Sequence, residues 1–430
     1  MTKPLTIGVA GLGTVGAGVL RLLADNASLI TARAGRPVQV SAVSARDRTR
    51  DRGVDLAGLR WHDDPVALAA DPSVDVVIEL IGGAEGSARA LVETALRAGK
   101  SVITANKALI AHHGNHLATL AEAHQAAFRF EASVAGGIPI IKALREGLAA
   151  NRIAAVSGIF NGTCNYILSR MRAEQLDFAT VLADAQAQGY AEADPSFDID
   201  GVDTAHKLAI LTALAFGRPV DFASIHVEGI RRVSALDIAF ADELGYRIKL
   251  LGIARATDAG IEARVHPAMV PLNAPLAQVD GVDNAVVIHG DPVGDVVLQG
   301  RGAGAGPTAS AVIADLIDLA RHRATPMLGV AHADLAMMAS MPMDQHRGAY
   351  FLRLMVQDQP GVIADITAVL RDHTISLESM LQHGRSASKA VPVVLVTHVT
   401  NEHAMRAALD RLAKLSAVLE PPTAIRIESA

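Results

Sequence analysis

The sequence lacks three features that would each define a large class of proteins. Cys164 is the only cysteine among 430 residues, so no intramolecular disulfide can form and the reducing cytoplasm is the expected location. No apolar run approaches the ~20 residues of a membrane span, so we expect no membrane association. The net charge is -6 and no block of basic residues occurs, which argues against nucleic-acid binding.

What remains is the composition of an ordinary soluble globular protein. Half of the residues are hydrophobic and 20% are charged. A chain of 430 residues predicts two or three domains with ample core. The apolar N-terminal stretch imitates a signal peptide, but its regularly spaced glycines and missing small-residue cleavage site favour a strand and a turn.

A glycine-rich turn follows the first predicted strand, residues 5–9, and a helical pattern follows the turn. Its pattern is Gly-x-Gly-x-x-Gly. Glycines at these positions permit a tight turn and let backbone N–H groups approach a pyrophosphate at the helix N-terminus. We therefore predict that a dinucleotide binds here, at Gly11, Leu12, Gly13, Thr14, Val15 and Gly16.

Residues 1–134 are predicted to form a Rossmann-type, doubly wound parallel sheet, because buried strand patterns alternate with helical stretches. Further strands are expected at 38–43, 74–80, 101–104 and 128–133. The second strand lacks a following acid that would bind the ribose of NAD, and Arg46 stands there instead. Arg46 could meet a 2′-phosphate, which favours NADP or dual use, or it could be a solvated loop residue.

Lys107 lies in the first turn of the helix that follows the strand at 101–104. The helix macrodipole opposes a cation there, and ligands collect at the carboxyl ends of parallel strands. Lys107 is therefore a candidate for cofactor or substrate contact, with a surface lysine as the alternative. Glu131 precedes a glycine-rich loop, residues 134–139, whose carbonyls could hold a cation, although a structural turn is the default.

The densest group of carboxylates lies in a loop broken by glycine and proline, followed by a helical pattern from Val202. Its charged residues are Glu192, Asp194, Asp198, Asp200, Asp203 and Lys207. Asp203 and Lys207 are four residues apart and share one helix face. The rest of that helix is apolar nearly all round, which predicts burial. A charged pair at the mouth of a buried helix indicates a functional site rather than an exposed ion pair.

Residues 135–307 are predicted to form a second, α+β domain with its own sheet, including strands at 261–265 and 285–288. Asn161 and Asn165 bracket a Gly-Thr turn and could bond a polar ligand or their own backbone. Cys164 could act as a nucleophile, but no histidine lies near it in the sequence. An inert buried cysteine is the alternative.

A second glycine-rich turn, which includes Gly306, opens a helix expected at 308–323. Because such a turn can return to the cofactor, we expect Gly306 to contact it and the helix to pack on the first domain. Residues 324–348 are predicted to be a linker. The pattern over 349–430 is strand, helix, strand, strand, helix, strand, which is the ferredoxin-like βαββαβ arrangement.

The acidic segment resembles the signature of homoserine dehydrogenases. The matching residues are Ala185-x3-Gly189-Tyr190, Asp194-Pro195, Asp198-Ile199-x-Gly201-x-Asp203 and Lys207. The glycine turn, Ala105-Asn106-Lys107, Glu131 with its loop, and residues 161–166 extend the resemblance over residues 1 to about 323. The tail, with Asp358-x-Pro360-Gly361-Val362, resembles an ACT domain.

The resemblance implies reversible reduction of L-aspartate 4-semialdehyde to L-homoserine by NADH or NADPH, in threonine, methionine and isoleucine biosynthesis. It implies that Lys207 donates a proton to the carbonyl oxygen and that Lys107 lies between nicotinamide and substrate. Glu192, Asp198 and Asp203 would hold the substrate's amino group, and the carboxylates would also orient the catalytic lysine. A sodium ion would be held by Glu131 and the carbonyls of Val134, Gly136 and Ile138.

The ACT-like tail implies feedback regulation, with threonine as the expected effector, in a homodimer or homotetramer. Two other functions stay open. An aspartate-semialdehyde dehydrogenase would share the cofactor fold but would need Cys164 as a thiol nucleophile. A non-catalytic amino-acid sensor would bind its ligand in the tail and its cofactor only for structure.

Overall fold

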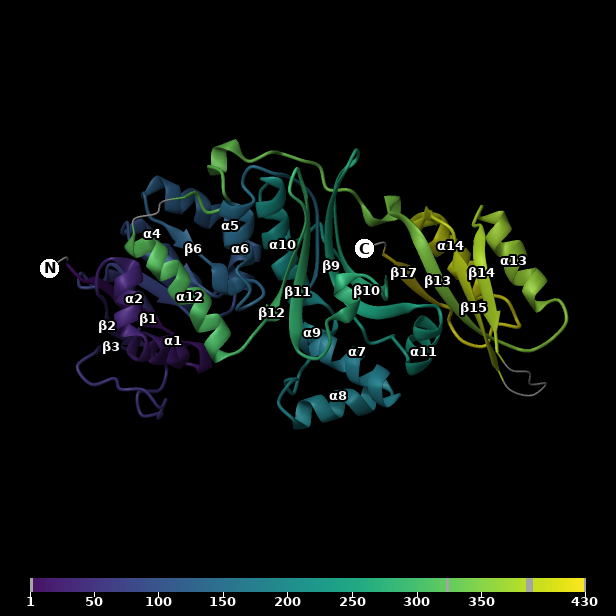
Figure 1. The fold of residues 1–430 in the computed structure, drawn as a ribbon, viewed down its shortest axis with the longest axis horizontal. Helices are drawn as coiled ribbons and strands as arrows, with labels where there is room; N and C mark the ends of the chain where they lie inside the picture. Colours follow the sequence, from purple (N-terminus) through teal and green to yellow (C-terminus); the bar gives the residue numbers. More distant parts are fainter. Residues whose placement is uncertain (1–2, 322–324, 384–389, 429–430) are drawn as a thin grey trace.

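The computed structural model describes residues 3–321, 325–383 and 390–428, and it contains two sheets side by side (Figure 1). Residues 322–324, where the predicted helix would end and the linker begin, lie outside the described residues. The predicted doubly wound sheet, the second sheet and the ferredoxin-like tail are all present. No helix among the described residues combines the length and apolarity needed to cross a bilayer.

The first sheet has six parallel strands in the order β3-β2-β1-β4-β5-β6. Their bounds are β1 Leu5–Ala10, β2 Val38–Ser44, β3 Arg60–His62, β4 Val76–Glu79, β5 Ser101–Thr104 and β6 Phe128–Arg129. The chain order reverses between β1 and β4, so the crevice for a ligand is expected at the carboxyl ends of these two strands.

Helices cover both faces of this sheet. The core on one face includes side chains from α3 (Pro65–Ala70), α4 (Ser87–Arg97) and α5 (Lys107–Ala123). The core on the other face includes α1 (Thr14–Asp25), α2 (Ala27–Ala34) and α12 (Ala305–Ala320). An added Cβ at Gly18 would lie 3.0 Å from the carbonyl oxygen of Ala305, so α12 returns from the second domain to pack closely on α1.

The strand predicted at 128–133 is shorter than expected. β6 ends at Arg129, and Glu131–Ser133 is a 3₁₀ turn. The backbone N–H of Glu131 donates to the buried carboxylate of Asp315 on α12 at 2.8 Å, instead of continuing a strand ladder. A contact 184 residues away along the chain therefore ends the strand, which local sequence does not predict.

The second sheet follows the path β12-β11-β7-β9-β10-β17-β13-β15-β14, with β8 and β16 paired at its sides. The strands from residues 152–301 are β7 Arg152–Ile159, β8 His226–Val227, β9 Tyr246–Thr257, β10 Gly260–Pro271, β11 Asp283–Asp291 and β12 Gly294–Arg301. The helices that pack with them are α7 Gly162–Glu174, α8 Phe178–Ala187, α9 Ser196–Ile199, α10 Val202–Phe216 and α11 Ala235–Glu243.

The tail continues this sheet rather than forming a separate one. Its elements are β13 Arg347–Val356, α13 Val362–Asp372, β14 Leu377–Gln382, β15 Val391–Thr397, β16 Thr400–Asn401, α14 Glu402–Leu412 and β17 Thr423–Ile427. β17 pairs in parallel with β10 of the second domain, with Arg426 beside Ala268. The fully buried Arg264 on β10 adds an ion pair to Glu428, in which its Nη2 lies 2.7 and 2.8 Å from the two carboxylate oxygens. The tail is therefore coupled to β10 by backbone pairing and by a buried charge.

Helix α10 lies between the two sheets (Figure 1). It begins after Gly201, ends at Gly217, and is buried from Asp203 to Ala213. It packs against α5 of the first domain and against β7, β9 and β10 of the second. This position brings Lys207 to the junction of the two domains.

Candidate active site

The Lys207 ammonium group is fixed by two acceptors. Its Nζ donates to Asp203 Oδ2 at 2.7 Å and to the backbone carbonyl of Phe160 at 2.6 Å. Only 9% of Lys207 is exposed. A lysine ammonium has three N–H donors. One donor therefore remains for a substrate oxygen.

Asp203 connects the two domains. Its Oδ1 lies 3.1 Å from the Nζ of Lys107, at the start of α5, while its Oδ2 accepts from Lys207. The Lys107 ammonium also lies 5.7 Å from the ring centroid of Phe197 on α9, within cation–π range. Lys107 follows the carboxyl end of β5. Its contact with Asp203 therefore brings α10 to the edge of the first sheet where the carboxyl ends of the strands lie.

Asn161 holds the two carboxylates expected to serve the substrate. Its Nδ2 donates to Asp198 Oδ1 and to Asp203 Oδ2, both at 2.8 Å. Its Oδ1 accepts from the backbone N–H of Cys164 and caps α7. The sequence left open whether Asn161 bonds a polar ligand or its own backbone; the structure shows the backbone bond and, in addition, bonds to two carboxylates. Asn161 and Asp203 are 42 residues apart, so their spacing in the sequence did not predict this hydrogen bond.

Burial and charge act in opposite directions on this cluster. Burial raises the pKa of Asp203, but the ammonium groups of Lys207 and Lys107 outweigh it and hold that pKa below the usual range. Burial lowers the pKa of Lys207, and Lys107 adds to this effect. Burial and the neighbouring Asp203 raise the pKa of Asp198. Lys207 is therefore a stronger acid than a solvated lysine, which suits proton donation near neutral pH.

An aromatic group that the sequence did not reveal surrounds the two lysines. The His206 ring lies 5.1 Å from His112, 4.6 Å from Phe222 and 5.4 Å from Phe197, between ring centroids. Burial lowers the pKa of His206 to about 4. His206 therefore stays neutral near physiological pH and adds no positive charge to the cluster.

Cys164 is inert in this setting. It is fully buried, and its Sγ donates to the backbone carbonyl of Asp198 at 3.2 Å. Burial, together with Asp198 and Asp203, raises the pKa of the thiol well above its ordinary value. A thiol without access to its thiolate form is a poor nucleophile. This geometry opposes the semialdehyde dehydrogenase alternative, which required Cys164 to attack.

Three predicted site residues form no hydrogen bond or ion pair with the side chains of this cluster in the described part of the chain. Glu192 is exposed, and among the described residues no cation lies within ion-pair distance of its carboxylate. Arg46 is exposed immediately beyond the end of β2. Gly306 lies in the first turn of α12, where an added Cβ would meet no atom within 4 Å. Their roles stay predictions.

The glycine turn fits the pyrophosphate of a dinucleotide. An added Cβ at Gly11 would lie 2.4 Å from the Leu80 carbonyl, and one at Gly16 would lie 2.0 Å from the Gly11 oxygen. A Cβ at Gly13 would meet nothing within 4 Å. Gly13 is the N-cap of α1 and has no side-chain cap, so the first-turn N–H groups beside it can receive an anion.

Polar residues that the sequence did not single out shape the crevice next to this turn. The buried Glu79 ends β4, and its carboxylate accepts from the N–H groups of Ile81 and Gly82 at 2.8 and 3.0 Å and from Thr104 Oγ1 at 2.5 Å. Asn106 Nδ2 donates to the Gly83 carbonyl at 2.7 Å. These bonds fix the loops after β4 and β5, between which Lys107 emerges.

Glu131 lies in a second buried acidic site. Its two oxygens accept from the backbone N–H groups of Ile141 and Lys142 at 3.0 and 2.9 Å. Burial and the nearby Asp315 raise the pKa of Glu131 to about 8. Ala135 and Gly136 both have left-handed φ angles of 53°, which marks the following loop as tightly constrained. A buried acid with free acceptor capacity beside backbone carbonyls fits a monovalent cation.

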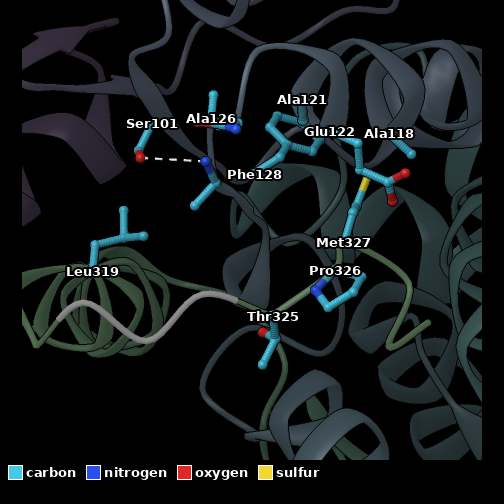
Figure 2. A pocket seen from close by; sticks show the side chains of 12 residues that line it. Ser101, Ala118, Ala121, Glu122, Ala126, Phe128, Leu319, Thr325, Pro326 and Met327 are labelled. Carbon is cyan, nitrogen blue, oxygen red and sulfur yellow. Dashed lines mark hydrogen bonds between the residues drawn. The ribbon is translucent and has the colours of Figure 1, made fainter. Parts of the chain in front are cut away.

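The described part of the chain offers no further metal site built from side chains. No group of three His, Cys, Asp or Glu side chains there could hold a metal ion. A cavity of about 460 Å³ is lined by residues that include Ser101, Phe128 and Met327 (Figure 2). It lies where β5 and β6 begin, at the edge opposite their carboxyl ends, and contains none of the predicted site residues.

A doubly wound sheet with an open glycine turn, joined through Lys107 and Asp203 to the buried ammonium group of Lys207, is typical of nicotinamide-dependent oxidoreductases. Comparison with known families gives the same class. Residues 11–131 match the family model "Homoserine dehydrogenase, NAD binding domain", residues 139–317 match "Homoserine dehydrogenase", and residues 350–417 match "ACT domain".

Relatives match over the whole chain. The homoserine dehydrogenase of Neisseria gonorrhoeae is 47% identical, covering 99% of both chains. The crystal structure of a homoserine dehydrogenase from Thiobacillus denitrificans has a TM-score of 0.94 and 48% identity, covering 99% of both chains. A hyperthermophilic archaeal homoserine dehydrogenase solved in complex with NADPH has a TM-score of 0.65 and 26% identity, covering 75% of this chain and 100% of its own.

The chain belongs to the homoserine dehydrogenase family. It is an NAD(P)-dependent oxidoreductase that interconverts L-aspartate 4-semialdehyde and L-homoserine, and it carries a C-terminal ACT domain. The resemblance read from residues 185–207 is confirmed.

Two glycines of the turn should respond differently to alanine. In Gly13→Ala the new methyl group enters open space where a phosphate would approach, so NADPH affinity should fall by about tenfold or more while the melting temperature stays unchanged. In Gly16→Ala it meets the Gly11 oxygen, so the melting temperature itself should fall. Fluorescence titration with NADPH and thermal unfolding of both variants check this. Unchanged affinity in Gly13→Ala would contradict the assignment.

Proposed function

We propose that Lys207 protonates the carbonyl oxygen of aspartate 4-semialdehyde as the aldehyde is reduced. The observation that carries this role is the fixed ammonium group, with two N–H donors bound by Asp203 and Phe160 and one free. Negative charge develops on the aldehyde oxygen during reduction, and a positioned ammonium both stabilises that charge and supplies the proton.

The other residues of the cluster position the reactants. Asp203 holds Lys207 and Lys107 from opposite oxygens, so both ammonium groups lie around one carboxylate. Lys107 stands between the cofactor crevice and the substrate. Asp198, with Glu192 and Asp203, binds the substrate's α-ammonium group. The nicotinamide, when bound, supplies the hydride.

Replacement of the proton donor tests the main proposal. Lys207→Ala should lower kcat on the order of 10²-fold or more because the general acid is lost. NADPH binding, measured by fluorescence, should be kept because the glycine turn is untouched. Lys207→Arg serves as the matched control: it keeps the charge but holds its proton too tightly to donate, so its rate should also be low. A Lys207→Ala enzyme with a near-normal rate would refute the role.

We also propose that NADP is preferred or that both cofactors are used. Two features support this: no acid stands directly at the tip of β2, where Ser44 is followed by Ala45, and Arg46 lies just beyond that strand. Arg52 lies on the same loop, and its Nε donates to the carbonyl of Leu12 at 3.1 Å, so the loop is tied to the glycine turn. A 2′-phosphate entering there would meet basic side chains.

Homoserine oxidation measured in parallel with NAD and NADP tests cofactor choice. In Arg46→Ala the KM for NADP should rise several-fold while the KM for NAD stays constant, because only NADP carries the 2′-phosphate. Arg33→Ala, a change on α2 outside that loop, is the control. Equal effects on both cofactors would assign Arg46 a structural role. Repeating the assay with threonine tests regulation.

We propose that a sodium ion binds to Glu131 and the carbonyls of Val134, Gly136 and Ile138. The constrained loop and the raised pKa of Glu131 support it, since a cation would relieve the cost of a buried carboxylate near Asp315. The Ile138 carbonyl already accepts from the N–H of Ile140 at 2.8 Å, which leaves its second lone pair for the ion.

The sodium proposal predicts a pH-dependent effect on stability. The pKa of Glu131 rises from 4.5 to about 8 on folding, so the folded state binds more protons and stability falls as pH rises between these values. Sodium binds only the ionised carboxylate of Glu131 and therefore competes with the proton. Replacing N-methylglucamine chloride with sodium chloride should therefore raise the melting temperature more at about pH 9 than at about pH 6. Glu131→Gln should abolish the difference; its persistence there would place the ion elsewhere.

We propose further that the ACT domain binds threonine and lowers activity, in a cytoplasmic homodimer or homotetramer. Gly361, with a φ of 98°, forms the turn into α13 beside Asp358, where an effector would dock. β14 ends the path of the second sheet, and Met380 on it is 48% exposed, which leaves an edge for a second copy of the chain.

A further inference from the structure

A second charged cavity lies between the ACT domain and the domain that carries α10. Its volume is about 860 Å³, within the size range of small-molecule sites. The second domain contributes Asp200, Glu228, Arg231 and Arg232, and the tail contributes Arg406 and Arg426. Neither the predicted catalytic residues nor the effector turn at Asp358–Gly361 lines it.

Its charged lining carries an excess of positive charge. Arg426 is paired with Glu228 at 2.9 Å and with Glu402 at 2.6 Å. Arg231 binds Asp200, and Arg406 lies 3.2 Å from Glu402, a carboxylate it shares with Arg426. Arg232 has no carboxylate within 4.0 Å among the described residues. Four guanidinium groups therefore face three carboxylates, which favours an anionic ligand.

Most of the remaining wall is apolar, with Tyr350 and Thr423 as polar exceptions. Met405 and Leu409 from α14, Ile425 from β17, and Pro421 and Pro422 line the cavity on the tail side. A purely inorganic anion would leave this surface in contact with water. Burial of apolar area contributes about 25 cal/mol per Å², so an apolar body next to the anionic head would add affinity.

We propose that this cavity binds a small organic carboxylate with an apolar body, such as a branched amino acid or its 2-oxo acid. The carboxylate would pair with Arg232 and Arg406, and the apolar body would contact Met405 and Leu409. Guanidinium groups bind carboxylates with bidentate geometry, which gives the site its preference for this head group.

The cavity wall contacts α9, the short helix that carries Asp198. The N–H of Ile230 donates to the carbonyl of Ile199 at 2.8 Å, and an added Cβ at Gly229 would lie 2.2 Å from that same oxygen. Ile199 follows Asp198 in α9, and Arg231 holds Asp200, the next residue. A ligand that draws Arg231 or Arg232 towards the cavity would shift α9 and the Asp198 carboxylate.

Binding in the cavity should therefore change the affinity of the enzyme for aspartate semialdehyde, a consequence that rests on the proposed role of Asp198. Linkage requires that the substrate change the affinity of the cavity ligand by the same factor. The link does not pass through the ACT effector turn, so it provides a second route by which small molecules control the same enzyme.

Calorimetric titration of the full-length chain tests the proposal, with leucine and 4-methyl-2-oxopentanoate as probes and inorganic phosphate for charge alone. We expect saturable binding of at least one organic probe and weaker binding of phosphate. Arg232→Gln with Arg406→Gln should weaken it about tenfold or more. Arg411→Gln, also on α14 but outside the lining, is the matched control and should bind normally.

Lys207→Ala should bind the probe as the unmodified chain does, so this result stands or falls separately from the catalytic proposal. Leucine binding alone would identify a zwitterionic ligand, and binding of the oxo acid alone a simple anion; either supports the site. Three outcomes would overturn it: no saturable binding of either organic probe, binding unchanged in the double arginine variant, or competitive displacement of the probe by homoserine.

Discussion

The arrangement of the active site depends on one buried carboxylate, that of Asp203. It accepts from Lys207 and Asn161 and lies 3.1 Å from Lys107, and these three partners come from three different elements. Without it, two ammonium groups would stay close together at a domain junction with little compensation. Removing one partner of a buried ion pair costs roughly 3–5 kcal/mol, so loss of the Asp203 carboxylate should destabilise the junction of the first two domains.

Features encoded by local spacing were predictable from the sequence. The glycine turn and the four-residue separation of Asp203 and Lys207 each lie within a few consecutive residues. The alternation of strands and helices is the sum of such short patterns along the first domain. The partners that make these residues useful are distant: Phe160 lies 47 residues from Lys207, and Asn161 lies 37 residues from Asp198. Periodicity cannot reveal such contacts, which is why the roles of Asn161 and of the Phe160 carbonyl emerged only from the structure.

The junction of the ACT domain shows a similar limit. The sequence pattern changes at Tyr350, which predicts a new unit, and that unit has the expected order of strands and helices. Yet β17 joins β10 through only two residue pairs, and its sequence gives no sign that its free edge is occupied. The buried pair between Arg264 and Glu428 strengthens this short contact. Backbone pairing and this ion pair therefore couple the tail to β10 of the second domain.

The opposing effects on Lys207 explain why a lysine can serve here. Burial alone would lower its pKa and favour the neutral amine, which cannot donate a proton to an alkoxide. Asp203 alone would bind the proton too firmly. Because the carboxylate is shared with Lys107 and Asn161, its hold on Lys207 is weakened while the pair stays ionised. The same burial raises the pKa of the neighbouring Cys164, so one environment makes the lysine acidic and leaves the thiol unreactive.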